Sequence, residues 1–167
     1  MPIDRNDSLP GGSLEEYLAA AEGTGAFRPS ELDVLQEVLT DAFADPSRGY
    51  LFLEERLPGG QLAGFAVFGR APMTDWAWDL YWIVVERSLQ GRGIGRRMLE
   101  KLEAIALAVT GKVILRVETS GRKEYEKQRQ FYLAAGFRET GRIRDFYEEG
   151  DDLVTYCKFL PGEKSLR

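Results

Sequence analysis

The stretch WDLYWIVVERSLQGRGIGRR, residues 78–97, decides the fold. Its first eight residues are almost continuously apolar or aromatic, which is typical of a strand buried on both faces. From Gly93 onward the period changes, because Ile94, Met98 and later apolar residues recur at helical spacing. Gly111 is expected to end this helix. The stretch therefore predicts a buried strand that leads through a glycine-rich turn into an amphipathic helix.

Strands are expected on both sides of this unit. VILRV at 113–117 is a second apolar strand, and a strand, helix and strand in this order predict a right-handed parallel connection. Upstream, 50–57 and 62–68 flank a Pro-Gly-Gly turn and predict a hairpin, and downstream 137–147 and 153–159 predict another. The predicted fold class is α/β (mixed α+β), with one central mixed sheet that is parallel in the middle, antiparallel at the ends and flanked by helices.

Helices are expected at three further places. Ser13 can cap a short helix, and Ser30 can cap a second one with a clear apolar period. Residues 124–135 predict a helix that a glycine ends. The length suits one domain over 1–167, with residues 1–12 loosely ordered because they are polar and rich in proline and glycine.

Composition excludes several kinds of chemistry. The formal charge of −5 argues against a nucleic-acid partner, which needs a basic face. The absence of histidine excludes a Ser-His-Asp triad and removes the usual zinc ligand, so no metal is expected. The single cysteine, Cys157, excludes an internal disulfide framework. No run approaches the roughly 20 apolar residues of a membrane span, so we expect a cytoplasmic protein with no membrane partner.

The turn between strand and helix is the best candidate for a binding site. A helix begins there, and the first turn of a helix offers N–H groups and the positive end of the dipole to an anion. Glycines let the backbone approach a ligand, and arginines add positive charge. The turn reads Gln90, Gly91, Arg92, Gly93, Ile94, Gly95, Arg96 and Arg97. It predicts a site for a phosphate group.

Two phosphate ligands remain open at this point. Gly91 and Gly93 supply two glycines of the dinucleotide pattern G-x-G-x-x-G, and Glu118 ends the next strand, as the ribose-binding acid would. Arg96 stands where the third, small residue is needed for close packing. A nicotinamide-dependent oxidoreductase is therefore the less favoured alternative.

Two blocks together resemble the GNAT superfamily of N-acetyltransferases. Gln90-x-x-Gly93-x-Gly95 resembles its acetyl-CoA signature, Q/R-x-x-G-x-G/A, and the sequence RQFYLAAGF at 129–137 resembles its F/L-Y-x-x-x-G-F segment. The resemblance covers about residues 27–160. One departure is Tyr125, which stands seven residues before the matching tyrosine, where many members carry Asn.

The resemblance implies acetyl-CoA as cosubstrate and a GNAT-like fold. It implies that the backbone of Ile83, Val84 and Val85 pairs with the pantetheine arm, as an added strand would. It implies that the residues from Gln90 to Arg96 hold the pyrophosphate. Tyr132 matches the general-acid tyrosine of the family, and a phenol can protonate a leaving thiolate.

The base that takes the proton of the amine is open. Asp79 is the first candidate, because it is a charged residue within an apolar strand, where burial raises the pKa of a carboxyl. Glu118, at the end of the neighbouring strand, is the second candidate, and Tyr81 is the third.

The predicted function is transfer of an acetyl group to the primary amine of a small molecule, by direct attack in a ternary complex. The rival from another class is a domain that binds acyl-CoA without turnover, as a sensor. A homodimer is expected on family grounds alone.

Overall fold

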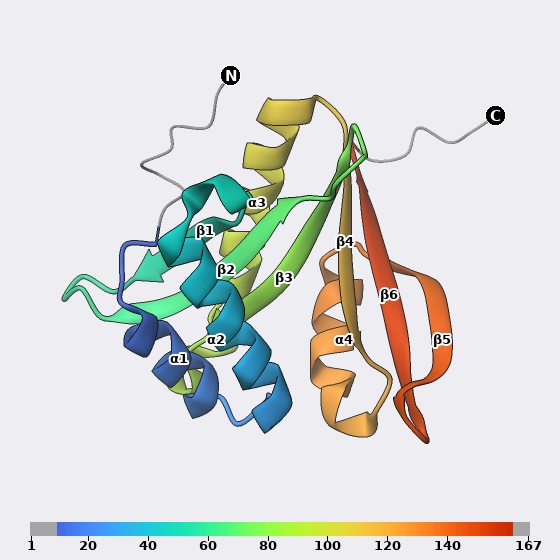
Figure 1. Ribbon diagram of the computed structural model, residues 1–167, viewed down its shortest axis with the longest axis horizontal. Helices are drawn as coiled ribbons and strands as arrows, with labels where there is room; N and C mark the ends of the chain where they lie inside the picture. Colours follow the sequence, from blue (N-terminus) through green and yellow to red (C-terminus); the bar gives the residue numbers. More distant parts are fainter. Residues whose placement is uncertain (1–9, 162–167) are drawn as a thin grey trace. The chain divides into compact units, whose positions relative to one another are not determined.

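The computed structural model describes residues 10–161, in which two α-helices are followed by three strands, a helix, a strand, a helix and two strands (Figure 1). The helices are α1 (Leu14–Gly23), α2 (Pro29–Ala44), α3 (Ile94–Thr110) and α4 (Glu126–Ala134). The strands are β1 (Leu51–Arg56), β2 (Leu62–Arg70), β3 (Ala77–Val85), β4 (Val113–Ser120), β5 (Arg138–Glu148) and β6 (Asp151–Leu160). The 3₁₀ turns within residues 10–161 are η2 (Pro46–Arg48), η3 (Arg87–Leu89) and η4 (Lys123–Tyr125).

The strands form one six-stranded sheet in the order β1-β2-β3-β4-β6-β5. β3 and β4 pair in parallel, while β1 with β2, β4 with β6 and β5 with β6 pair antiparallel. The predicted mixed sheet is therefore confirmed. β6 lies between β4 and β5, so the final hairpin pairs with β4 through its second strand, and β5 is left at the edge.

The chain divides into two compact units. The first holds residues 10–69 and 80–105, and the second holds 70–79 and 106–161. The prediction of one domain over 1–167 stays a prediction.

In the first unit, helices cover both faces of β2. Leu35, Leu39 and Ala42 recur along α2 at helical spacing, and with α1 they pack against Phe65 and its neighbours in β1 and β2. Ala63, on the other side of β2, packs against Ile94 and Met98 of α3. This two-sided burial explains why eight of the nine residues of β2 are buried.

The N-terminal caps of α1 and α2 were both predicted from the sequence, and one of the two predictions is confirmed. Ser13 caps α1, since its side chain accepts a hydrogen bond from the N–H of Glu16, as predicted. The cap predicted at Ser30 is wrong, because α2 begins one residue earlier, at Pro29, with Arg28 in the capping position. Proline suits the first helical position, where its fixed φ is already helical and no N–H is required.

The loose order expected for residues 1–12 stays a prediction. Residues 1–9 lie outside the described residues. Gly11 and Gly12 both donate backbone hydrogen bonds to Glu54 Oε1, at 2.7 and 3.1 Å. Glu54, on β1, is thus a hydrogen-bond partner for both glycines that the local sequence does not reveal.

In the second unit, α4 packs through aromatic contacts. The ring of Tyr132 lies 5.5 Å from that of Phe137 and 6.3 Å from that of Tyr156 on β6. α4 itself begins at Glu126, two residues later than predicted, because η4 forms a tighter turn before it. The hairpin turn contracts to Glu149 and Gly150, and Gly150 has a left-handed φ of 81°, which glycine adopts without a steric penalty.

Candidate active site

The predicted glycine turn lies between β3 and α3, in the first unit. Gly91 and Gly93 have φ values of 78° and 77°, in the left-handed region that glycine enters without a steric penalty. A Cβ on Gly91 would meet no heavy atom within 4 Å. The glycine is therefore required there by its backbone angle and not by crowding.

The start of α3 has the features of an anion site. The first N–H groups of any helix lack intrahelical acceptors, and the first turn of α3 contains no acidic residue. Arg92 and Arg96 are exposed, and Arg96 forms an exposed pair with Glu100 at 3.1 Å. Arg97 instead turns back, and its Nη1 donates to the carbonyl of Arg92 at 3.2 Å. Arg97 thus braces the turn, while Arg92 and Arg96 reach solvent.

The turn is fastened to the end of β3. Gln90 Nε2 donates to the carbonyl of Val85 at 3.2 Å, and the N–H of Glu86 donates to Ala63 on β2 at 2.9 Å. The register of β3 with β4 covers only Ala77 to Asp79, and β3 continues beyond it to Val85. The residues predicted to contact acetyl-CoA, 83–85 and 90–96, are consequently consecutive parts of one strand–turn–helix unit.

Tyr132 lies in α4 of the second unit and is 7 % exposed. Burial raises the pKa of its phenol above the ordinary value of 10.0, so the phenol stays protonated near neutral pH. Its hydroxyl has no hydrogen-bond partner among residues 10–161. A protonated donor without a partner can serve an incoming acceptor.

Asp79 and Glu118 also belong to the second unit. Both oxygens of Asp79 accept hydrogen bonds from Arg116, at 2.6 and 3.0 Å. This arrangement opposes the predicted role of Asp79 as a base, because a proton would have to displace a bidentate ion pair. Glu118 is exposed on β4, opposite Thr155 of β6, and its carboxylate helps to raise the pKa of Arg116.

Tyr81, the third candidate for the base, lies on β3 within the first unit. It is 38 % exposed, and its ring stacks edge-on against Tyr50 with 5.4 Å between the ring centres. Tyr125, at the position of the family asparagine, is buried.

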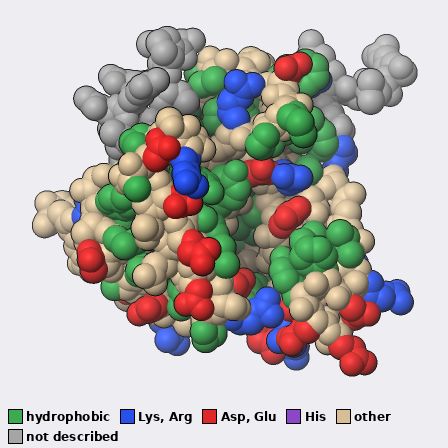
Figure 2. Space-filling view, in the orientation of Figure 1, with side chains coloured by type: hydrophobic (Ala, Val, Ile, Leu, Met, Phe, Trp, Pro, Cys, Tyr) green, Lys and Arg blue, Asp and Glu red, His purple; other side chains and the backbone are tan. Residues whose placement is uncertain are grey.

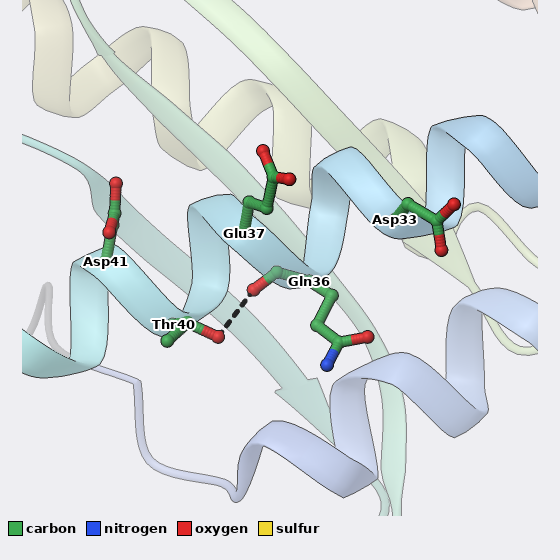
Figure 3. Close-up of a pocket in the computed structure, with 5 residues that line it drawn as sticks. All are labelled: Asp33, Gln36, Glu37, Thr40 and Asp41. Carbon is green, nitrogen blue, oxygen red and sulfur yellow. Dashed lines mark hydrogen bonds between the residues drawn. The ribbon is translucent and has the colours of Figure 1, made fainter.

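The outer face of α2 carries a row of carboxylates that the sequence interpretation missed. Asp33, Glu37 and Asp41 lie four residues apart and, with Gln36 and Thr40, line an open hollow of about 620 Å³ (Figure 3). Figure 2 shows acidic side chains gathered over this helix. Asp41 pairs with Arg48 at 2.8 Å. The four-residue spacing of these carboxylates is present in the sequence, on the same helix as the apolar period that indicates its inner face.

Within residues 10–161, no group of three or more histidine, cysteine or acidic side chains could hold a metal ion. In the same residues, no helix is both long enough and apolar enough to cross a membrane.

Comparison with known proteins defines the class. Residues 46–139 match the family described as "Acetyltransferase (GNAT) domain". An uncharacterized N-acetyltransferase of Methanocaldococcus jannaschii is 26 % identical over 147 residues, 83 % of this chain and 92 % of the relative. The N-alpha-acetyltransferase RimI of Mycobacterium tuberculosis is 34 % identical over 99 residues, 58 % of this chain and 59 % of the relative.

Solved structures agree. A crystal structure from Desulfovibrio desulfuricans, assigned to the GNAT family of acetyltransferases, is 34 % identical, covers 87 % of this chain and 90 % of that one, and gives a TM-score of 0.81. An aminoglycoside 6'-N-acetyltransferase complexed with coenzyme A shares the fold at 16 % identity, with a TM-score of 0.68 over 95 % of both chains.

The fold and the matched family define an N-acetyltransferase. The chain belongs to the GNAT family of acetyltransferases. This finding overturns the alternative of a nicotinamide-dependent oxidoreductase, which rested on Gly91, Gly93 and Glu118.

Proposed function

We propose that this protein transfers the acetyl group of acetyl-CoA to the primary amine of a small molecule, by direct attack within a ternary complex. The observation that carries the proposal is the turn between β3 and α3. It combines two left-handed glycines, a helix start without acidic residues and two solvent-facing arginines. This combination suits the pyrophosphate of a coenzyme A molecule.

The cosubstrate is proposed to lie along the end of β3 and the start of α3. The backbone of Ile83, Val84 and Val85 would pair with the amides of the pantetheine arm, as a peptide adds to a sheet. The pyrophosphate would accept hydrogen bonds from the first N–H groups of α3 and from Arg92 and Arg96. Gln90 would support the turn through Val85, to which it already donates.

In the proposed reaction, the neutral amine nitrogen attacks the thioester carbonyl carbon and a C–N bond forms. The oxygen takes negative charge, and a backbone N–H stabilises it. The intermediate then collapses, the C–S bond breaks, and the leaving thiolate takes the proton of the Tyr132 hydroxyl. The proton of the amine passes to a base, for which we favour Glu118 or a bound water over Asp79, because Arg116 already occupies both oxygens of Asp79.

The acceptor is proposed to be cationic before it reacts. The carboxylates of Asp33 and Glu37 give the hollow on α2 a negative potential that attracts ammonium groups, whereas the charge of Asp41 is offset by Arg48. The aminoglycoside acetyltransferase that shares the fold acts on a small molecule with amino groups, whereas RimI is named for acetylation at an α-amine. We favour the small molecule because the hollow is open and acidic.

A cytoplasmic location and a homodimer complete the proposal. β5 is an edge strand whose side chains are all exposed, and its apolar members include Ile143 and Phe146. An exposed, partly apolar edge strand offers a surface that a second copy could cover.

The direct test is release of coenzyme A thiol from acetyl-CoA in the presence of amines. The panel would hold an aminoglycoside, a polyamine, free amino acids and a peptide with a free α-amine. We expect acetylation of a polycationic small molecule, confirmed by a mass increase of one acetyl group. Turnover of the peptide alone would refute the small-molecule proposal. Tight binding of acetyl-CoA without any turnover would favour a sensor.

A further inference from the structure

A buried polar cluster holds the segment that follows β4. Asp151 is 0 % exposed and forms a hydrogen bond with the hydroxyl of Ser120. The same hydroxyl accepts the N–H of Arg122 at 3.1 Å, and Arg122 Nε lies 3.6 Å from Asp151. The N–H of Gly121 donates to the carbonyl of Asp152 at 2.8 Å. The segment is therefore fixed to the start of β6.

Arg129 of α4 is bound to this same segment. Its Nη1 donates to the carbonyl of Ser120 at 2.8 Å and to the carbonyl of Arg122 at 2.6 Å. Both bonds are charge-assisted, and such bonds are shorter and stronger than neutral ones. Because the two acceptors are backbone atoms of a fixed segment, they define one position for the guanidinium.

α4 depends on tertiary contacts to hold its position. The helix has nine residues, of which only Tyr132 is buried. Helices of this length are marginal in isolation, so tertiary contacts must hold them. Arg129 stands three residues before Tyr132, and residues at this spacing share one face of a helix. The contacts of Arg129 and the ring contacts of Tyr132 thus orient the same face.

The charge of Arg129 also reaches the aromatic cluster around Tyr132. Burial raises the pKa of the Tyr156 phenol, and Arg129 opposes part of that rise. The ring of Tyr156 lies 6.3 Å from that of Tyr132. The guanidinium therefore lies close enough to the cluster to affect the phenol of Tyr156.

We propose that Arg129 is a positioning residue: through its two hydrogen bonds to the segment after β4, it sets the place of α4 and hence the direction of the Tyr132 hydroxyl. This inference rests on the proposed role of Tyr132 as general acid.

Misplacement of a catalytic group by about 1 Å can cost about 100-fold in rate. Arg129→Met, which keeps the length of the side chain but removes both hydrogen bonds, should lower kcat about 10- to 100-fold and leave the KM for acetyl-CoA within about twofold. Arg129→Lys, which keeps a donor, should recover most of the loss.

The test is a double-mutant cycle of Arg129→Met and Tyr132→Phe, with kcat as the readout and Gln130→Met as an exposed control on the same helix. If Arg129 acts through Tyr132, Arg129→Met lowers kcat in the wild type but not in the Tyr132→Phe background. An equal loss in both backgrounds, or no loss in the wild type, would overturn the positioning role while the acid role of Tyr132 stands. A Tyr132→Phe enzyme with full kcat would instead overturn the acid role, and the positioning role with it. If Arg129→Met does not fold, Arg129→Leu, which also lacks both donors, takes its place in the cycle and is read in the same way.

Discussion

Arg116 of β4 forms a bidentate ion pair with Asp79 of β3, in which Nε donates to Oδ1 at 2.6 Å and Nη2 donates to Oδ2 at 3.0 Å. The two residues are direct partners in the parallel register of the strands. The pair therefore lies where β3 and β4 are joined, and Asp79 raises the pKa of Arg116 and keeps it charged.

Asp79→Asn should weaken folding without removing a base. The change leaves Arg116 without its carboxylate, and loss of a charged hydrogen-bond partner costs about 1.5–3 kcal/mol. For a domain of this size we expect the melting temperature to fall by about 3–12 °C. We expect kcat/KM to rise with pH as the base loses its proton, and the midpoint of that rise should be the same in Asp79→Asn as in the wild type. Disappearance of that rise in a folded Asp79→Asn enzyme would restore Asp79 as the base.

Tyr132→Phe should lower kcat by about 100- to 10 000-fold, the usual range for loss of a general acid. Because the side chain is buried and the substitution removes only the hydroxyl, affinity for acetyl-CoA should change little. Calorimetric titration of acetyl-CoA into both proteins, beside steady-state kinetics, checks the two halves of this prediction. A parallel loss of affinity would mean that Tyr132 binds the cosubstrate instead of acting as its acid.

The raised pKa of Tyr132 also predicts how stability depends on pH. The folded protein holds the phenolic proton above the unfolded value of 10.0. The stabilising effect is thus complete below about pH 10 and is lost as pH rises above it. Melting temperatures measured from pH 8 to pH 11 should fall at the alkaline end, and less steeply in Tyr132→Phe. Identical curves for the two proteins would contradict the burial of this phenol.

Gly91→Ala and Gly93→Ala should each strain the turn. At φ near +78° an alanine costs about 1–2 kcal/mol, although neither new Cβ meets a backbone atom. Coenzyme A binding should weaken in both, because the strained turn shifts the N–H groups at the start of α3. Gly59→Ala, in the β1–β2 turn without a positive φ, is the matched control and should bind as the wild type does. Wild-type affinity for coenzyme A in all three variants would show that the turn is not part of the binding site.

Arg92→Ala and Arg96→Ala should weaken coenzyme A about tenfold or more, since charge-assisted hydrogen bonds contribute about 1.5–3 kcal/mol. The loss should shrink at high salt, because exposed charges are screened. Titrations at low and high ionic strength check this. Arg96→Ala needs comparison with Glu100→Ala, which removes the pair partner alone. Equal losses from these two variants would assign the effect to the helix and not to a phosphate contact.

The sequence predicted the strand–turn–helix at 78–97 because its signals are local: an apolar run, glycines and a helical period. Contacts made by distant residues were not predictable in this way. Asp79 was interpreted as a base, since nothing nearby in the chain reveals Arg116, 37 residues away. The sequence places Arg129 only within the block that resembles the family. Its hydrogen bonds were not predictable, because their acceptors are backbone carbonyls, which every residue has. The prediction of a cap at Ser30 was wrong for a local reason, because proline prefers the first helical position and Pro29 occupies it.

Thermal unfolding with increasing acetyl-CoA tests the central claim most directly, when the wild type is compared with Gly93→Ala. A ligand at 100 times its dissociation constant adds about 2.7 kcal/mol, or roughly 5–10 °C for a domain of this size. We predict a rise of this order in the wild type and a clearly smaller one in Gly93→Ala. Equal rises would show that acetyl-CoA binds away from the β3–α3 turn. No rise at saturating concentrations would contradict an acetyl-CoA-dependent function for this protein.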